Sequence, residues 1–397
     1  MSGKIKIGVF GGRRGLALLR AAQAHPECEV VAVCDMYEPF LNDCKKFAES
    51  RNLNIACYKD FESFFQHDSD AIVLANYANE HAPYAIRSLK SGRHVLSELM
   101  PVQTMAEAVA LVEAVEQSGK VYGFAENCCY MKPAMEMKKY YREGMLGDFL
   151  HGEGEYIHNC IPIWENLTRN DPNHWRNRMY STFYCTHSLG PLLTITGTRP
   201  VRVVGFENYN AAYLNENQCM MAASGMLAIQ MSNGATVKNV NGFLKREPPL
   251  HWYSLYGTKG FMESSRIGDE NKIHIQFDDH QLTKNVLSYI PDETIKNESG
   301  HGGADYYAVH YFLQSILGRE EGKEMIDVYT ALDMFLPGLL GYRSILEGNI
   351  PYDIPNFRNK TESVNLREIY RNDHMCTDPK AANGQIIPVN SGRCCNK

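Results

Sequence analysis

The sequence has no large charge excess, no long apolar run and no cysteine pattern typical of a metal site. Its 40 Lys and Arg against 46 Asp and Glu give a net charge of −6, which argues against a mainly electrostatic binder of nucleic acid or anionic membrane. No apolar run approaches the roughly 18 residues of a membrane span. The twelve cysteines are scattered, and no Cys-x-x-Cys pair recurs at zinc-site spacing. Together with an N-terminus that lacks the apolar segment of a signal peptide, these absences predict a reduced, cytoplasmic protein.

The N-terminal third of the chain alternates short β-branched runs with helical patterns. This alternation is typical of βαβ units around a parallel sheet. A helix is expected over residues 16–24, after the first strand. The expected strands are residues 4–10, 29–34, 71–75, 94–98 and 121–124.

The pattern changes at about residue 126, where strand-like segments follow one another with few helices between them. Such spacing favours an open, mostly antiparallel sheet. Helices are expected over residues 133–143, 304–317 and 326–346, and the last residues are polar. The expected strands are residues 150–158, 201–207, 225–231, 236–243 and 251–256.

A glycine-rich turn, Gly11-Gly12-Arg13-Arg14-Gly15, separates the first expected strand from the first expected helix. The dinucleotide fingerprint in this position is G-x-G-x-x-G. The last two glycines of the turn match it, whereas Phe10 takes the place of the first. Glycine allows the backbone to approach a pyrophosphate, whose charge the helix N-terminus stabilises. Arg13 and Arg14 can add cationic contacts to the same anion.

Asp35 strengthens the prediction of a dinucleotide site, because it ends the second strand 20 residues after Gly15. A carboxylate there accepts hydrogen bonds from ribose hydroxyls and repels a 2′-phosphate, which favours NAD over NADP. The alternative is a tight turn followed by a solvated Asp. We therefore predict an α/β protein with three parts. These are a Rossmann NAD-binding domain (1–125), an α+β domain with an open sheet (126–350) and an extended C-terminal tail (351–397).

Residues 71–81 and the segment 91–98 (SGRHVLSE) resemble the Gfo/Idh/MocA oxidoreductase superfamily, and the resemblance extends over nearly the whole chain. Members pair an N-terminal Rossmann domain with a C-terminal open-sheet domain. The resemblance implies that His81 and Glu98 line the cofactor cleft. It also implies a homo-oligomer, because the open sheet of this superfamily often packs against another subunit.

Five further segments, in order, make the sequence similar to the NAD-dependent glycosidases of glycoside hydrolase family 109. They are 126–130 (ENCCY), 151–158 (HGEGEYIH), 173–176 (NHWR), 184–191 (YCTHSLGP) and 300–303 (GHGG). The resemblance implies that Tyr156 removes the C2 proton of a sugar and that His187 handles its C3 hydroxyl. Other implied contacts are Asn127 with the cofactor and His174, Trp175, Arg176 and His301 with the sugar.

Two departures from the dehydrogenases of the superfamily bear on the reaction. In those dehydrogenases a Lys usually follows the Glu that corresponds to Glu98, and here that position is Leu99. An Asp usually stands four residues before their catalytic His, and here that position is Phe183. The resulting expectation is a glycosidase that oxidises C3 transiently, eliminates the aglycone after C2 deprotonation, adds water and reduces C3 again. An NAD-dependent sugar 3-dehydrogenase and a non-catalytic NAD-binding sensor remain as alternatives.

A group of possible metal ligands, His151, Glu153, Glu155 and His158, lies on one expected strand. The first three share one strand face, whereas His158 points to the other. No metal site is therefore expected there. The expected partner is a small sugar or glycoside, with neither nucleic acid nor membrane.

Overall fold

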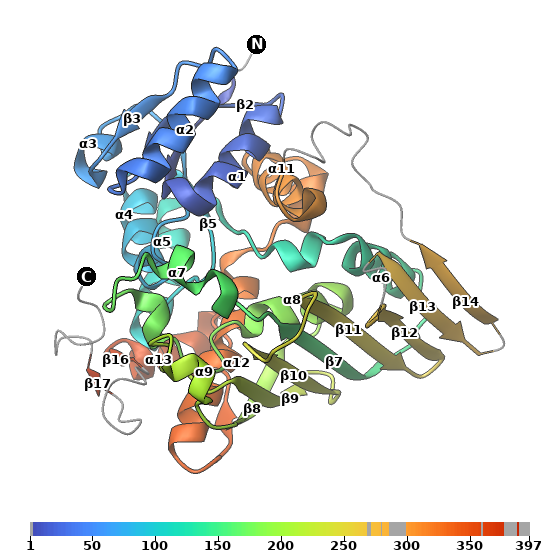
Figure 1. Ribbon diagram of the computed structural model, residues 1–397. Helices are drawn as coiled ribbons and strands as arrows, with labels where there is room; N and C mark the ends of the chain where they lie inside the picture. The colour runs from blue at the N-terminus through green and yellow to red at the C-terminus, as the bar shows by residue number, and fades with distance from the viewer. Residues whose placement is uncertain are drawn as a thin grey trace. The chain divides into compact units, whose positions relative to one another are not determined.

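The computed structural model describes residues 3–267, 271–278, 280–285, 299–358, 360–376 and 387–388. The chain divides into two compact units, shown with their helices and strands in Figure 1. The N-terminal unit comprises Met1–Asn127 and Ile290–Ala331, and the C-terminal unit comprises Cys128–Tyr289 and Leu332–Lys397. This division differs from the one drawn from the sequence, because a later segment of the chain joins the N-terminal unit.

The N-terminal unit is built on a six-stranded parallel sheet in the order β3-β2-β1-β4-β5-β6. The strand order reverses between β1 and β4, which is the switch point where Rossmann folds bind dinucleotides. Its strands are β1 (Ile5–Phe10), β2 (Cys28–Cys34), β3 (Ala56–Tyr58), β4 (Ala71–Leu74), β5 (His94–Ser97) and β6 (Tyr122–Phe124).

Helices cover this sheet, with α1 beside α2 and α11, and α4 beside α5. Helix α11 comes from late in the sequence, yet it packs closely on β6, where a Cβ at Gly123 would lie 3.0 Å from the Phe312 ring. The helices are α1 (Gly12–Ala24), α2 (Glu38–Ser50), α3 (Phe61–Phe65), α4 (His81–Lys90), α5 (Met105–Ser118) and α11 (Ala304–Ile316), with short turns η1 (Ala78–Glu80), η5 (His301–Gly303) and η6 (Glu320–Glu324).

The C-terminal unit is built on a nine-stranded sheet in the order β14-β13-β12-β11-β7-β10-β9-β8-β15. Only β7 and β10 pair in parallel among these described strands, so the expected open and mostly antiparallel sheet is confirmed. The strands are β7 (Phe149–Ile157), β8 (Pro200–Glu207), β9 (Ser224–Met231), β10 (Thr236–Gly242), β11 (Leu250–Gly257), β12 (Gly260–Ser264), β13 (Lys272–Phe277), β14 (His280–Asn285) and β15 (Tyr352–Asp353).

Helices α6, α8 and α12 lie over one face of this sheet. Strand β7 approaches α8 so closely that a Cβ at Gly154 would lie 1.8 Å from the Ser188 carbonyl oxygen. This approach fixes Tyr156 of β7 beside the first turn of α8. The helices are α6 (Lys132–Arg142), α7 (Trp164–Thr168), α8 (Cys185–Thr196), α9 (Ala212–Asn215), α12 (Val328–Leu346) and α13 (Lys360–Tyr370), with η2 (Asn127–Tyr130), η3 (Ile161–Ile163), η4 (Trp175–Arg178) and the short pair β16 (Met375–Cys376) and β17 (Ile387–Pro388).

The expected strands and helices lie within a few residues of the observed ones, and three differences stand out. Helix α1 begins at Gly12 rather than residue 16, because the glycine turn itself forms its first turn. Strands β12, β13 and β14 extend the sheet beyond the strands expected. The segment expected as an extended tail supplies β15, which pairs with β8, and helix α13.

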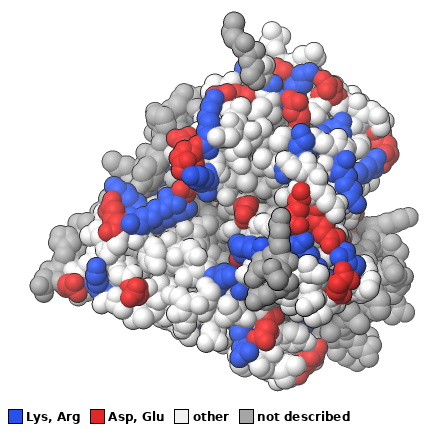
Figure 2. Space-filling model, turned by 180° about the vertical axis from the view of Figure 1, so that it is seen from behind, with Lys and Arg blue, Asp and Glu red and all other residues white. Residues whose placement is uncertain are grey.

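The surface carries both signs of charge. On the face shown in Figure 2, Lys and Arg side chains lie next to Asp and Glu side chains, and neither sign covers a broad area. Within the described part of the chain, no helix is both long and apolar enough to cross a membrane.

Candidate active site

The glycine turn of the N-terminal unit has a geometry that only glycine satisfies. Gly11 has φ 103°, in the left-handed region, and a Cβ there would lie 2.3 Å from the backbone of Ala75. A Cβ at Gly15 would lie 2.7 Å from Cγ1 of Val9, so this glycine lets α1 pack tightly on β1. Close approach of the backbone and tight helix–strand packing are the two uses of glycine in a dinucleotide turn.

Asp35 lies at the end of β2, directly beside this turn. Its carboxylate accepts hydrogen bonds from the backbone N–H of Gly12, at 2.6 Å, and of Tyr37, at 2.7 Å. The acid is therefore held where the first residue of α1 begins. Arg13, in the same turn, has its guanidinium 5.5 Å from the centre of the Phe40 ring.

Arg14 forms a buried ion-pair network within the N-terminal unit. Its Nη1 and Nη2 donate to the two carboxylate oxygens of Asp305, each at 2.7 Å, and Nη2 lies 2.6 Å from Glu98 Oε1. His301 Nδ1 lies 3.2 Å from the Asp305 carboxylate. Burial raises the pKa of Asp305, but the charges and hydrogen bonds of Arg14, and then of His301, lower it by more. The pKa of Asp305 therefore lies below its ordinary value. Burial also raises the pKa of Glu98, which Arg14 only partly offsets.

Several buried polar atoms among the described residues of this unit have no hydrogen-bond partner, and two of them bear on the predicted cofactor site. They are Nε2 of His81 and Oδ1 of Asn127. The Nδ1–H of His81 donates to the Met100 carbonyl at 3.1 Å, which leaves Nε2 as an acceptor. Burial lowers the pKa of His81 to about 4, so the ring is neutral at pH 7. Unsatisfied buried polar atoms beside a glycine turn fit a bound dinucleotide, whose amide and hydroxyl groups would satisfy them.

The second group of predicted residues lies in the C-terminal unit and centres on Tyr156. This side chain is buried, and its hydroxyl forms a hydrogen bond of 3.0 Å with Nδ1 of His158. The ring centres of Tyr156 and His187 are 4.5 Å apart. Burial raises the pKa of Tyr156 well above its ordinary value. A base of this kind therefore needs a neighbour that takes up the phenolic proton, and His158 is in contact with it.

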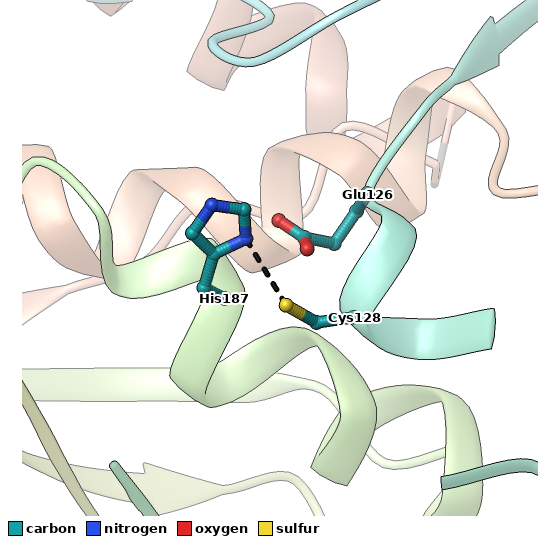
Figure 3. Close-up of side chains that lie close together, drawn as sticks. All are labelled: Glu126, Cys128 and His187. Carbon is teal, nitrogen blue, oxygen red and sulfur yellow. Dashed lines mark hydrogen bonds between the residues drawn. The ribbon is translucent and has the colours of Figure 1, made fainter. Parts of the chain in front are cut away.

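His187 is held from several sides at the start of α8. Its Nδ1 lies 3.3 Å from Sγ of buried Cys128, as Figure 3 shows together with Glu126. The ring of Tyr184 stacks on the imidazole at 5.6 Å with an interplanar angle of 4°. The hydroxyl of Tyr253 donates to the His187 backbone carbonyl at 2.9 Å. These contacts give the imidazole a defined orientation.

Three of the four residues predicted to contact the sugar, His174, Trp175 and Arg176, lie beside one another in the C-terminal unit. The Arg176 guanidinium donates to the Tyr184 hydroxyl and lies 4.6 Å from the Trp175 ring centre. His174 Nδ1 accepts from the Arg176 backbone N–H at 3.2 Å. Phe183, which stands in place of the dehydrogenase Asp, packs 5.6 Å from Trp175. Phe183 thus lies in an aromatic cluster, at the position where the dehydrogenases of the superfamily usually have an Asp.

Comparisons with known proteins identify the two domain types that the chain contains. Residues 5–126 match the family model of the Gfo/Idh/MocA oxidoreductases with an NAD-binding Rossmann fold, and residues 229–362 match the C-terminal domain of glycosyl hydrolase 109. A glycosyl hydrolase family 109 protein of Phocaeicola vulgatus is 25% identical, over 89% of this chain and 84% of its own length. The chain thus carries an N-terminal domain of the Gfo/Idh/MocA oxidoreductase type and a C-terminal domain of the glycosyl hydrolase 109 type.

Other relatives extend this picture. The glycosyl hydrolase family 109 protein of Streptomyces filamentosus is 26% identical, over 89% of this chain and 77% of its own length. The WlbA dehydrogenase of Bordetella pertussis, solved with NADH and UDP-GlcNAcA, shares the fold with a TM-score of 0.69 at 19% identity, over 89% and 99% of the two chains. The protein is an NAD-dependent enzyme.

The two acids of β7 that were considered as possible metal ligands, Glu153 and Glu155, form ion pairs in this protein. Glu153 pairs with Lys238 of the neighbouring strand β10, and Glu155 pairs with Arg266 at 2.5 Å. His151 Nδ1 lies 2.9 Å from the Thr236 hydroxyl. Each of these side chains thus has a protein partner.

The sequence analysis missed three side chains that contact the predicted catalytic pair. Tyr184 and Cys128 contact His187, and His158 contacts Tyr156. The strand pattern does predict the position of His158. Residues two apart on a strand share a face, so His158 lies on the same face as Tyr156. For Cys128 there was none, since 59 residues separate it from His187.

Proposed function

We propose that this protein is an NAD-dependent glycoside hydrolase. In the proposed reaction, C3 of the sugar is oxidised, the C2 proton is removed, and the C1 substituent leaves. Water then adds at C1, and C3 is reduced again. The net reaction is hydrolysis with no net redox change. The observation that carries the proposal is the contact between Tyr156 and His187, 4.5 Å between ring centres, in a chain whose residues 229–362 match the glycosyl hydrolase 109 domain.

When bound, NAD would supply the redox chemistry of the reaction, the reversible hydride transfer at C3. In this proposal the glycine turn and Asp35 hold its adenosine half. His81, Glu98 and Asn127 are the proposed contacts to the rest of the molecule. The unsatisfied Nε2 of His81 and Oδ1 of Asn127 support that assignment.

Tyr156 is the proposed base for the C2 proton. A free phenolate is costly here, because burial raises the pKa of Tyr156 well above its ordinary value. We therefore couple two transfers: the phenolic proton moves to Nδ1 of His158, 3.0 Å away, as the phenolic oxygen takes the C2 proton. Because His158 takes the phenolic proton, no free phenolate has to form before the C2 proton is removed. A neighbouring base activates a weakly basic group in this way.

His187 is the proposed partner of the C3 hydroxyl. Its Nδ1 faces the Cys128 thiol, so Nε2 is the atom proposed to exchange a proton with the sugar. An imidazole side chain can take up and release a proton near neutral pH, which suits it to this exchange. The sugar itself is proposed to contact His174, Trp175, Arg176 and His301.

Two alternatives differ in outcome. A sugar 3-dehydrogenase would release a 3-keto product and NADH, and a sensor would bind NAD without turnover. Leu99 and Phe183 weigh against the dehydrogenase, because they replace its usual Lys and Asp. The buried, mutually contacting Tyr156 and His187 weigh against the sensor, which needs no proton-transfer groups.

The deciding experiment incubates the purified protein with a panel of aryl glycosides in D₂O. The C2 position exchanges only if deprotonation occurs after C3 oxidation. We expect release of the aryl alcohol and deuterium at C2 of the sugar product, detected by NMR. Stoichiometric NADH without aryl alcohol would establish the dehydrogenase instead. Bound NAD with neither product across the panel would favour the sensor.

A further inference from the structure

Arg14 of the glycine turn has its guanidinium engaged by two acids rather than open toward an anion. Nη1 and Nη2 form the two parallel bonds of a fork with the Asp305 carboxylate, each at 2.7 Å, and Nη2 also lies 2.6 Å from Glu98. The Asp305 side chain is fully buried and that of Arg14 is 28% exposed. Bidentate arginine–carboxylate pairs are strong and have a fixed geometry.

Asp305 in turn holds the loop that carries His301. Three consecutive residues of this loop have left-handed backbone angles: His301 at φ 55°, Gly302 at φ 63° and Gly303 at φ 101°. Such a run is strained at a non-glycine residue and persists only where its surroundings fix it. The His301 Nδ1 lies 3.2 Å from the Asp305 carboxylate, and a Cβ at Gly300 would lie 2.2 Å from Asp305 Oδ2. The loop is therefore folded tightly against this one side chain.

The charges of the network also oppose a phosphate at Arg14. One guanidinium faces two carboxylates, so the three side chains carry a net negative charge when all are ionised. An anionic pyrophosphate that drew on Arg14 would have to compete with both acids and would be repelled by them. Arg13, in the same turn, has its guanidinium 5.5 Å from the centre of the Phe40 ring.

We propose that Arg14 is a positioning residue and not a pyrophosphate ligand. Its bidentate pair with Asp305 fixes the His301 loop, and its ion pair with Glu98 fixes that acid of the cofactor cleft. The backbone of the glycine turn then holds the pyrophosphate, while the arginine links that turn to Asp305, 291 residues later in the chain, and so to the His301 loop. The placement of His301 toward a sugar rests on the proposed function, whereas the link between Arg14 and the loop does not.

The test uses Arg14→Lys and Arg14→Met, with Arg13→Met as the matched control from the same turn. Lysine can bind a phosphate as a point charge but cannot form the fork. The first measurement is the dissociation constant of ADP, which contains the pyrophosphate and lacks nicotinamide. The second is amide hydrogen exchange of peptides covering residues 299–305, and the third is KM for an aryl glycoside.

We expect the ADP dissociation constant of Arg14→Lys to stay within about twofold of wild type, while exchange in 299–305 accelerates at least about tenfold. KM for the glycoside should rise more than kcat falls, because His301 is displaced. Arg13→Met should leave loop exchange unchanged. An ADP affinity that falls about tenfold in Arg14→Met, returns in Arg14→Lys and leaves the loop protected would overturn the proposal.

Asp305→Asn is a second, independent variant in case the Arg14 variants do not fold. It removes one charge of the fork and should accelerate loop exchange in the same peptides without weakening ADP binding. Unchanged exchange in Asp305→Asn would also refute the link. Because ADP binding and exchange need no turnover, a protein that fails to hydrolyse glycosides still gives a decisive result.

Discussion

The predicted cofactor groups of the N-terminal unit and the predicted catalytic groups of the C-terminal unit have different kinds of partner. In the N-terminal unit, full charges are paired with each other, as Arg14 is with Asp305 and Glu98. In the C-terminal unit, the predicted catalytic groups are uncharged or weakly basic side chains in mutual contact, namely Tyr156 with His158 and His187 with Cys128. Paired charges fix geometry, whereas hydrogen bonds between neutral titratable groups allow a proton to move.

This difference separates two tasks of one reaction. A cofactor must be held in one place, and burial of paired charges makes rearrangement costly. Acid–base catalysis needs groups that gain and lose a proton, which a strong ion pair suppresses by shifting the pKa away from neutrality. The comparison predicts that substitutions in one unit impair binding and those in the other impair turnover.

The largest expected effect tests the close packing of strand β7 on helix α8, which carry Tyr156 and His187. Gly154→Ala places a methyl group against the Ser188 carbonyl, where a Cβ would lie at 1.8 Å. Because backbone rather than a side-chain tip blocks the space, we expect a loss of about 3 kcal/mol or more in the free energy of unfolding. Chemical denaturation measures it.

Two controls sharpen this result. Gly152→Ala, on the same face of β7, meets only the side-chain tips of Phe149 and Leu192 at 3.0–3.4 Å and should cost less. Gly15→Ala in the N-terminal unit meets the Val9 side chain at 2.7 Å and should rank between them. Equal losses in Gly154→Ala and Gly152→Ala would mean that the β7–α8 approach is not as tight as described.

Tyr156→Phe tests the division between turnover and binding directly. It removes the hydroxyl that contacts His158 and leaves the ring in place. We expect turnover to fall at least about 100-fold, the low end for an acid–base group, with the NAD dissociation constant unchanged. Steady-state kinetics and calorimetry give the two quantities.

The matched control is Tyr256→Phe, because Tyr256 lies on β11 with 43% of its surface exposed. It should keep both turnover and NAD binding. Near-wild-type turnover in Tyr156→Phe would remove this residue from the catalytic role, and a large loss of NAD affinity would contradict the separation of the two units.

The sequence predicted most of the framework, because hydrophobic alternation and turn residues are local signals. Residues 94–98 were expected as a strand, and β5 is His94–Ser97. Strand β13 was missed, although its sequence KIHIQF alternates strictly and a period of two was readable. That omission was avoidable.

The candidate site was predicted unevenly for a physical reason. Tyr156 and His187 were assigned from local motifs, but their contact requires strand β7 to approach helix α8, which no local pattern encodes. Likewise, Arg14 was assigned to a phosphate because a basic residue in a glycine turn suggests one. Its pairing with Asp305, 291 residues away, depends on how α11 returns to the first unit.

A pH titration of stability tests whether His81 is held neutral in the N-terminal unit. Burial lowers the pKa of His81 to about 4, against 6.5 in the unfolded chain. The unfolded chain therefore binds more protons below pH 6.5, and stability is lost as the pH falls from 6.5 toward 4. From this group we expect a loss of about 2 kcal/mol between pH 7 and pH 5.

His81→Asn provides the reference for that titration. Its amide can still donate to the Met100 carbonyl but does not titrate. Denaturation of both proteins at pH 7 and pH 5 isolates the contribution of His81, since every other group is shared. If wild type and variant lose equal stability over this range, His81 is not kept neutral by burial.

The smallest expected effect concerns Asp35, the acid that accepts hydrogen bonds beside the glycine turn. Asp35→Asn keeps one oxygen, which can accept from either the Gly12 or the Tyr37 N–H group, and removes the charge that repels a 2′-phosphate. We expect the ratio of NADP to NAD affinity to rise about tenfold, equivalent to about 1.4 kcal/mol. Asp43→Asn, on α2 with a side chain 57% exposed, is the control and should leave the ratio unchanged. A ratio that stays constant in Asp35→Asn would show that cofactor choice, unlike cofactor placement, does not depend on the fixed charges of this unit.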